Sequence, residues 1–165
     1  MKKVILLFVA VAALSCAHAQ KTKFSEEALS ETLLSANGAQ VAFQDILKKY
    51  KGKNLVIEVW ASWCSDCVKA MPKIKELQAG HPNSAYVFIS MDKTADKWKE
   101  GIQKHELVGD HYMAKDGMKG TFGTAIDLDW IPRYIIVNKK GDVILYRAIE
   151  TDFDRIDMIL KRAEQ

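Results

Sequence analysis

The chain has 165 residues, of which 48% are hydrophobic and 27% are charged. These proportions are typical of a soluble globular domain, and they argue against a disordered chain or a protein with many membrane spans. The length allows one domain with a substantial core and is too short for two ordinary domains. The formal net charge is only +3, so the composition does not indicate a nucleic-acid partner.

Residues 1–19 show the pattern of a secretory signal peptide. Lys2 and Lys3 precede an apolar run at 4–14, and residues 17–19 (Ala-His-Ala) supply a small-x-small cleavage site. The apolar run is too short to span a bilayer. We predict cleavage after residue 19 and a periplasmic or otherwise extracytoplasmic location. Loss of the two lysines takes the 24 basic residues to 22 against 21 acidic ones.

Cys16 allows a second interpretation of this leader. A cysteine in this position can become a lipid-modified N-terminus, which would tether the protein to a membrane. The residue three positions earlier is Ala13 rather than the usual leucine, and the cleavage site follows at once. We therefore favour a secreted protein, with a membrane tether only if Cys16 is lipidated.

The mature chain is predicted to form one domain, residues 20–165, whose first part, residues 20–40, is an N-terminal arm. Ser25 and the two glutamates after it indicate a helix start, so residues 26–35 form a short helix or an irregular segment. Apolar periodicity and turn residues then predict elements in this order: an edge strand at 41–43, a helix at 44–51, a buried strand at 55–60, a helix from 64 to about 79, a buried strand at 86–91, an amphipathic helix at 96–106, an irregular Gly-rich stretch at 108–124, a hairpin of strands at 134–137 and 143–146, and a final helix from 152 or 154.

The most informative feature is the pair Cys64 and Cys67, which stands where the strand at 55–60 gives way to a helix. A helix N-terminus offers unpaired backbone N–H groups and partial positive charge, which favour a thiolate. Once Cys16 has left with the signal peptide, these two cysteines alone remain. A disulfide across so short a loop adds little stability. The pair is therefore predicted to be a reactive dithiol–disulfide centre.

The order of the elements, β-α-β-α followed by a hairpin and a closing helix, predicts the α/β class. We expect a mixed sheet covered by helices on both faces, with the reactive pair at the C-terminal edge of a central strand.

Four features together make residues 40–163 resemble the thioredoxin superfamily, in particular its exported TlpA/ResA-like branch of thiol-disulfide oxidoreductases. They are the W-C-x-x-C motif after a buried strand, Pro72 five residues beyond the second cysteine, an acid within the strand (Glu58), and the pair Ile131-Pro132 before the hairpin. The resemblance implies a thioredoxin-like three-layer α/β/α sandwich with a central mixed sheet. It also implies an insertion between the second core strand and a cis-proline loop.

The resemblance assigns a role to each matching residue. Cys64 would be the attacking thiolate and Cys67 the buried resolving cysteine, so the two would form the redox-active disulfide. Glu58 would transfer a proton as Cys67 attacks or leaves, as suits a carboxyl whose pKa is raised by burial. Pro132 would be cis and would present the Ile131 backbone to an extended substrate.

Flanking residues are expected to shape the substrate site. Trp63 is expected to shield the thiol and to form part of the substrate-binding groove. Arg133, directly after the proline, is expected to favour acidic or polar partners there. Trp60, Trp98 and Trp130 are expected to be core residues, although Trp130 stands near enough to Pro132 to flank a substrate.

The dipeptide between the cysteines is Ser65-Asp66 rather than the Gly-Pro of ordinary thioredoxins. A carboxylate there disfavours the Cys64 thiolate and so favours a more reducing protein. An exposed charge contributes about 0.2–1 kcal/mol, or roughly 5–20 mV, whereas members of the superfamily differ by about 150 mV. Asp66 therefore indicates a direction without fixing it.

The expected activity is exchange of the Cys64–Cys67 dithiol/disulfide with protein cysteines, with a lean towards reductase of the cytochrome c maturation type. The expected partners are cysteine-containing proteins and an upstream redox partner such as a membrane thiol carrier. We expect a monomer with no cofactor. We also expect no bound metal, because zinc needs four ligands and the candidate histidines are irregularly spaced. They are His81 in a turn, His105 on a helix surface and His111 in a loop.

Several alternatives remain open. The centre could serve a protein disulfide oxidant or isomerase. A thiol peroxidase is a further possibility, although Ser62 does not supply the Thr-x-x-Cys spacing. The domain could also be a non-catalytic binding module, in which Glu58 would be a structural core acid.

Overall fold

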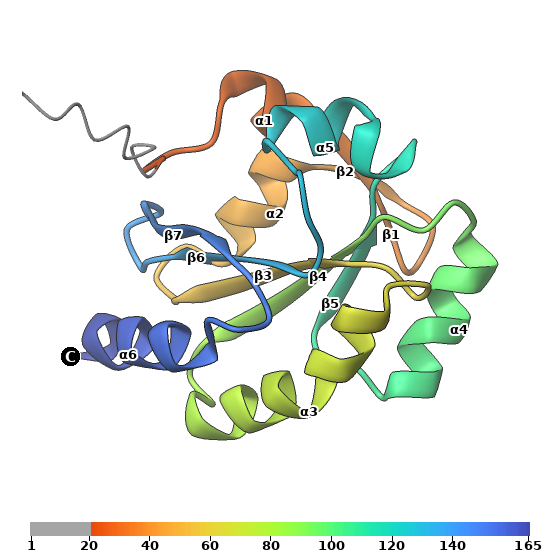
Figure 1. The fold of residues 1–165 in the computed structure, drawn as a ribbon. Helices are drawn as coiled ribbons and strands as arrows, with labels where there is room; N and C mark the ends of the chain where they lie inside the picture. Colours follow the sequence, from red (N-terminus) through yellow and green to blue (C-terminus); the bar gives the residue numbers. More distant parts are fainter. Residues whose placement is uncertain (1–20) are drawn as a thin grey trace, which may run out of the picture.

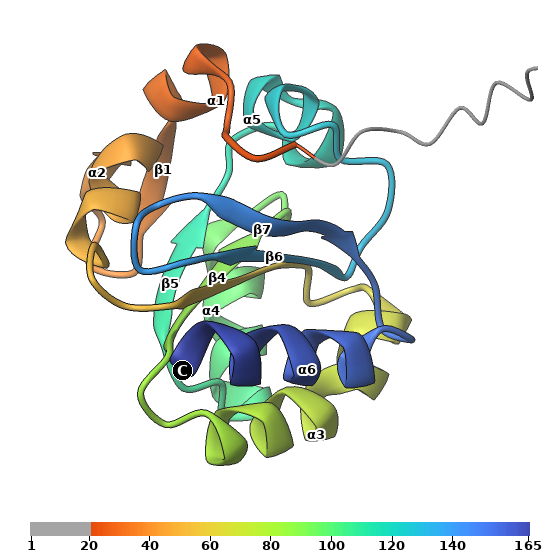
Figure 2. The ribbon, with the colours of Figure 1, turned by 90° about the vertical axis from the view of Figure 1, so that its left-hand side faces the viewer.

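The computed structural model describes residues 21–165, so the predicted signal peptide and Cys16 lie outside the described residues. The described chain forms a seven-stranded sheet in the order β2-β1-β5-β4-β3-β6-β7, with helices against both faces (Figures 1 and 2). The strands are β1 (Thr32–Ser35), β2 (Gln40–Ala42), β3 (Leu55–Trp60), β4 (Ala85–Ser90), β5 (Asp110–Met113), β6 (Arg133–Val137) and β7 (Val143–Ala148). The helices are α1 (Glu26–Ser30), α2 (Phe43–Lys49), α3 (Ser65–Gly80), α4 (Ala95–His105), the short 3-10 helix η1 (Gly117–Lys119), α5 (Thr121–Ala125) and α6 (Phe153–Glu164).

The three layers follow from the connections between strands. β3, β4 and β5 are parallel, and the right-handed crossovers through α3 and α4 place both helices on one face. Helix α6 lies beside α3 on that face, while α1, α2 and α5 cover the other (Figures 1 and 2). β6 and β7 add an antiparallel hairpin beyond β3. The predicted α/β/α sandwich with a mixed sheet is therefore confirmed.

β3 is the central strand that carries the site. It lies between β4 and β6, and all six of its residues are buried. A strand covered on both faces has no side that alternates with water, which explains its nearly continuous apolar sequence. The strand predicted at 55–60 is confirmed in full, and so is the hairpin formed by β6 and β7.

Two segments are more regular than the sequence predicts. The stretch 26–35 divides into α1 and β1, and the Gly-rich stretch 108–124 contains β5, η1 and α5. Gly109 explains part of the second difference, because a Cβ there would lie 2.7 Å from the Tyr86 carbonyl oxygen at φ +152. Glycine thus permits the close approach with which β5 joins β4. The insertion implied by the resemblance stays a prediction.

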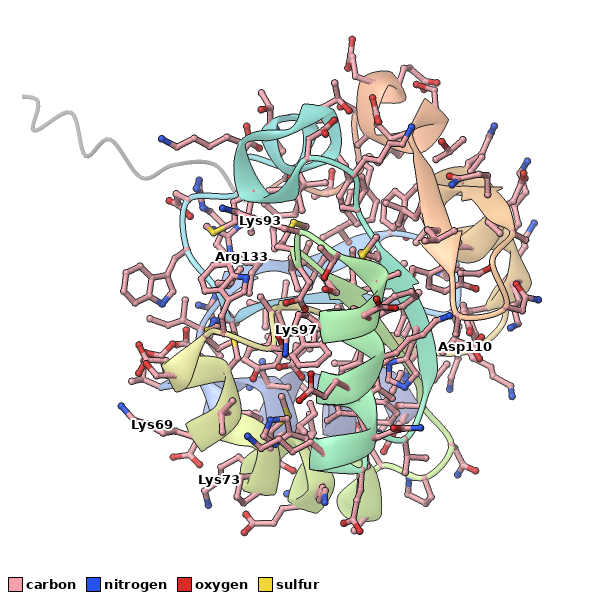
Figure 3. The ribbon with its side chains drawn as sticks, turned by 90° about the vertical axis from the view of Figure 1, so that its right-hand side faces the viewer. Lys69, Lys73, Lys93, Lys97, Asp110 and Arg133 are labelled. Atoms are coloured by element: carbon pink, nitrogen blue, oxygen red, sulfur yellow. A yellow bond between two sulfur atoms is a disulfide. The ribbon has the colours of Figure 1, made fainter. Side chains whose placement is uncertain are left out.

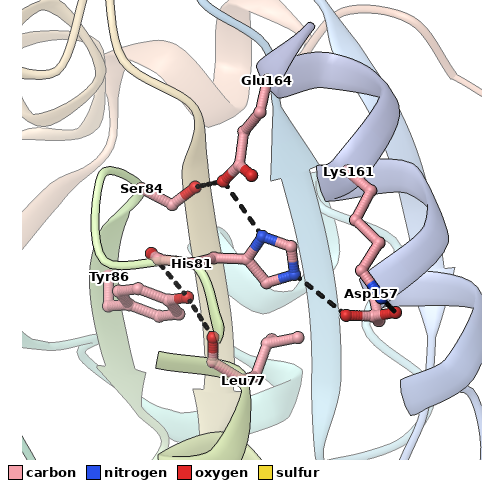
Figure 4. Close-up of polar contacts among 7 residues, drawn as sticks. All are labelled: Leu77, His81, Ser84, Tyr86, Asp157, Lys161 and Glu164. Carbon is pink, nitrogen blue, oxygen red and sulfur yellow. Dashed lines mark hydrogen bonds and ion pairs between the residues drawn. The ribbon is translucent and has the colours of Figure 1, made fainter. Parts of the chain in front are cut away.

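Helices α3 and α6 are joined at one end by His81, which is 1% exposed and follows the last turn of α3. Its Nδ1 lies 3.0 Å from Oε1 of Glu164 and its Nε2 lies 3.1 Å from Oδ1 of Asp157 (Figure 4). The Ser84 hydroxyl also donates to Glu164, at 3.3 Å. His81 therefore connects the two helices and is part of the buried structure. His111, predicted in a loop, lies in β5 and stacks on Phe88.

Candidate active site

Cys64 and Cys67 form a disulfide at the start of α3, with their Cα atoms 5.3 Å apart. Cys64 is the N-cap of the helix, and its Sγ accepts a hydrogen bond from the backbone N–H of Cys67 at 3.1 Å. Cys64 is 7% exposed and Cys67 is fully buried. In the reduced protein the same N–H group and the helix dipole favour a negative charge on the Cys64 sulfur. The geometry therefore distinguishes Cys64, whose sulfur accepts a backbone hydrogen bond and which keeps a small exposed area, from the fully buried Cys67.

The loop before β6 borders the outer sulfur. The Ile131-Pro132 peptide bond is cis, as the resemblance implies. The carbonyl oxygen of Ile131 lies 3.5 Å from Sγ of Cys64. Because β6 pairs with β3, the loop is held against the start of α3. The structure thus brings Ile131 and Pro132 together with the cysteine pair, although they lie more than 60 residues away in sequence.

Arg133 corrects one expectation. We expected this side chain to favour acidic or polar partners in the groove, but the residue is 1% exposed. Its guanidinium points into the protein and forms an ion pair with Asp129. Asp129 also pairs with Arg147 at 2.8 Å. The charge of Arg133 is paired with Asp129 in the loop that precedes β6 and is buried, so it is not available to a partner.

Glu58 lies in β3 and is 1% exposed. It stands opposite Tyr134 of β6, whose hydroxyl donates a hydrogen bond to Oε1 at 3.4 Å. Oε2 has no hydrogen-bond partner among the described residues. Burial raises the pKa of Glu58 to about 8, and the hydrogen bond from Tyr134 opposes part of that rise. At neutral pH the carboxyl is therefore largely protonated, with a minor ionised fraction.

Asp92 is a site residue that the sequence reasoning missed. It follows the end of β4 and is 2% exposed. Its carboxylate accepts hydrogen bonds from the Ser62 backbone N–H at 3.0 Å, the Ser62 hydroxyl at 2.7 Å and the Ser90 hydroxyl at 2.7 Å. One signal could have found it, because the carboxyl ends of the parallel strands β3 and β4 share one sheet edge. Asp92 fixes the loop that leads into Cys64.

The four tryptophans divide into two pairs. Trp60 and Trp98 are fully buried, as expected, whereas Trp63 is 59% exposed and Trp130 is 50% exposed. The expectation that Trp130 is a core residue is therefore wrong. It precedes Ile131 and belongs to the surface near the cis-proline loop. Trp63, directly before Cys64, presents an apolar surface beside the outer sulfur.

Neither a metal centre nor a membrane span emerges from residues 21–165. Among these residues no group of three or more His, Cys, Asp or Glu side chains is arranged to hold a metal ion. Over the same range no helix is both long and apolar enough to cross a membrane.

Comparison with known proteins agrees with the geometry. A family model described as thioredoxin-like matches residues 52–143. The thiol-disulfide oxidoreductase ResA of Bacillus thuringiensis subsp. konkukian is 24% identical over 146 residues, which cover 87% of this chain and 80% of that protein. A solution structure of a putative thiol-disulfide oxidoreductase from Bacteroides vulgatus is 28% identical with a TM-score of 0.66, over 83% of this chain and 88% of the other.

A more distant structure shares the fold alone. It is a secreted Mycobacterium tuberculosis disulfide oxidoreductase, described as homologous to E. coli DsbE. It has 18% identity and a TM-score of 0.64, over 84% of this chain and 99% of the other.

A cysteine pair of this geometry on this sheet defines a thiol-disulfide oxidoreductase, and the relatives carry that activity in their names. The chain belongs to the thioredoxin-like family, as a TlpA/ResA-like member of the thioredoxin superfamily.

Proposed function

We propose that this thiol-disulfide oxidoreductase works outside the cytoplasm as a reductase of protein disulfides, with Cys64 as nucleophile and Cys67 as resolving cysteine. The observation that carries the assignment of roles is the hydrogen bond from the Cys67 N–H to Cys64 Sγ at the N-terminus of α3. It supports a thiolate on Cys64, and within residues 21–165 no comparable hydrogen bond reaches the sulfur of Cys67, which is fully buried.

In the proposed cycle the Cys64 thiolate attacks one sulfur of a partner's disulfide, and the partner's other sulfur leaves as a thiolate. Cys67 then loses its proton and attacks Cys64 Sγ. This step forms the Cys64–Cys67 disulfide and releases the second partner sulfur as a thiolate. The substrate protein gains two electrons. An upstream redox partner, such as a membrane thiol carrier, then supplies two electrons that reduce the Cys64–Cys67 disulfide again. The chemistry needs no bound cofactor.

Glu58 is proposed to receive the proton that Cys67 loses. A carboxyl whose pKa is about 8 has a minor ionised fraction near neutral pH, and that ionised form can accept the proton in one half-cycle and return it in the other. Trp63, Ile131 and Pro132 are proposed to hold the partner segment beside Cys64.

The reductase direction is supported by the resemblance and by the Ser65-Asp66 dipeptide. Nζ of Lys69 lies 3.1 Å from Oδ1 of Asp66 and offsets part of its charge. The dipeptide is therefore weaker support for the reductase direction than the resemblance is. Cytochrome c maturation is the process we propose for this activity. Equilibration of the protein with glutathione tests the direction. A potential more oxidising than about −180 mV, in the region of disulfide isomerases, would contradict the proposal and favour an oxidant or isomerase.

Cys67→Ser tests the roles of the two cysteines. This variant should hold partners as mixed disulfides on Cys64, whereas Cys64→Ser, the matched control, should hold none. Recovery of no cysteine-containing proteins would count against protein substrates. Partner binding and phenotype that survive in Cys64→Ser would favour a binding module. Rapid turnover of hydrogen peroxide would favour the peroxidase alternative.

Export and anchoring are tested together by the mature N-terminus. We expect the protein in the periplasmic or extracellular fraction, beginning at Gln20. A lipid on Cys16, abolished by Cys16→Ala, would show the tethered form instead. A cytoplasmic protein that keeps its leader would contradict the proposed location.

A further inference from the structure

A groove runs between α4 and the loop that precedes Cys64. Its first part is a cavity of about 590 Å³ lined by Ser62, Trp63, Asp92, Lys93, Thr94 and Lys97. A second cavity of about 210 Å³ shares Ser62 and Lys97 with it and continues past Lys104. We call these two adjoining cavities the α4 groove. It begins at Trp63, one residue from the nucleophilic sulfur.

The rim of the α4 groove is basic. Lys93 and Lys104 have no ion-pair partner within residues 21–165, and Lys97 pairs with Glu100 at 2.7 Å. Figure 3 shows Lys93 and Lys97 on the side of the molecule that carries α4. Glu100 lines the second cavity and is the acidic residue of the rim. Three lysines therefore face one exposed carboxylate.

The lysines of the groove, Lys93, Lys97 and Lys104, outnumber its two carboxylates, Asp92 and Glu100. Asp92 lies in the wall, but it is 2% exposed and its oxygens accept from Ser62 and Ser90. Burial and the nearby Lys104 and Lys75 lower the pKa of His105, so it adds less positive charge than an ordinary histidine. The surface that a partner meets is positive, with the exposed Trp63 ring as its apolar wall.

We propose that the α4 groove binds the segment of a partner protein that flanks the reacting cysteine, and that this segment is acidic. This inference rests on the proposed function, because it places the partner's sulfur at Cys64. A partner sulfur bonded to Cys64 puts the neighbouring residues against Trp63. Successive Cα atoms are 3.8 Å apart, so the residues next along the partner chain reach Lys93 and Lys97.

Charge complementarity of this kind acts mainly on the rate of encounter and on the choice of partner. Lys93, Lys97 and Lys104 would accelerate association with acidic segments and would leave the chemistry of the disulfide unchanged. Exposed charges of this type are screened at high ionic strength.

The test uses two peptides that contain an internal disulfide and differ only in four flanking residues, all Glu in one and all Gln in the other. The reduced protein transfers two electrons and two protons to either peptide. We expect a second-order rate about fivefold higher for the Glu peptide at low ionic strength. The difference should vanish in about 0.5 M salt, where the Debye length is only about 4 Å.

The variant that tests the groove is Lys93→Gln/Lys97→Gln. Within one variant the ratio of the Glu rate to the Gln rate does not depend on the fraction of folded protein. This ratio should fall by at least half in the double variant, which keeps Lys104. It should keep its wild-type value in Lys140→Gln, because Lys140 follows β6 at the end of the sheet opposite Cys64. The ratio of the two rates with dithiothreitol corrects for any intrinsic difference between the peptides.

Two results would contradict the proposal that the α4 groove binds an acidic segment. One is a corrected ratio near one in the wild type, and the other is a ratio that the double variant leaves unchanged. Failure of the wild type to reduce 2-hydroxyethyl disulfide, a small neutral probe, would instead contradict the redox function, and with it the groove.

Discussion

The carboxylate of Asp92 accepts two hydrogen bonds from Ser62, one from its backbone N–H at 3.0 Å and one from its hydroxyl at 2.7 Å. The end of β4 thereby holds the loop that delivers Cys64 to the N-terminus of α3. The Ser90 hydroxyl donates to the same carboxylate, at 2.7 Å. A buried carboxylate with three donors is a rigid support for the residues just before the nucleophile.

Asp92→Ala should lower the free energy of unfolding by about 1–3 kcal/mol, because it leaves a backbone N–H and two hydroxyls without their acceptor. Urea unfolding measures the change. Ser62→Ala is the matched control, since it removes only the hydrogen bond from the Ser62 hydroxyl, keeps the one from the Ser62 backbone N–H, and should cost less. An equal loss in both variants would show that the hydrogen bonds from the Ser62 backbone N–H and the Ser90 hydroxyl contribute nothing.

Glu58→Gln should change the pH dependence of stability. The pKa of Glu58 is raised to about 8 in the folded protein from an ordinary value of 4.5, so the folded state holds its proton more tightly than the unfolded state. Its contribution to stability is therefore present below about pH 4.5 and is lost as the pH rises to about 8. Relative to Glu58→Gln, the wild type should lose up to about 1.4 kcal/mol per pH unit in this window.

Unfolding in urea at pH 5, 6, 7 and 8, for wild type and variant, measures that slope. Parallel pH profiles for the two proteins would mean that Glu58 titrates near its ordinary pKa, and the proton-transfer role would lose its basis.

Trp63→Ala and Trp60→Ala should have different effects on stability and on substrate reduction, because Trp63 is exposed and Trp60 is buried. Trp63 is 59% exposed, so its truncation should change the unfolding free energy by no more than about 0.5 kcal/mol. It should nevertheless slow the reduction of protein disulfides, because the apolar surface beside Cys64 is lost. Trp60 is fully buried, and its truncation should cost about 3–5 kcal/mol. Unchanged kinetics with protein substrates in Trp63→Ala would remove Trp63 from the substrate site.

His81→Ala should destabilise the protein by about 1–3 kcal/mol, because the carboxylates of Asp157 and Glu164 lose a buried hydrogen-bond partner that ties α6 to α3 (Figure 4). Thermal or urea unfolding measures the loss. His105 in α4 is the control, since it is partly exposed, and His105→Ala should change stability by no more than about 0.5 kcal/mol. Equal effects of the two substitutions would refute a structural role for the His81 contacts.

Local patterns in the sequence were enough to place the elements that carry the chemistry. The apolar run of β3 reflects burial on both faces, and the change to helical spacing at Cys64 marks the start of α3. The cysteine pair follows from its spacing at a strand-to-helix junction, whereas Glu58 and the proline after Ile131 are indicated by the resemblance to the thioredoxin superfamily. No local pattern indicates β5 in the Gly-rich stretch. Its pairing with β4 and β1 involves residues that are distant in sequence.

The fold class and the cysteine pair can be predicted from the sequence, since periodicity and motif spacing are properties of neighbouring residues. Which polar groups meet depends on how the chain packs. Asp92 and Ser62 are 30 residues apart, and their contact depends on the common edge of β3 and β4. Arg133 follows the proline in sequence, yet its side chain is buried and its guanidinium pairs with Asp129. Hydrogen bonds and ion pairs between distant residues are selected by packing, which no local sequence pattern records.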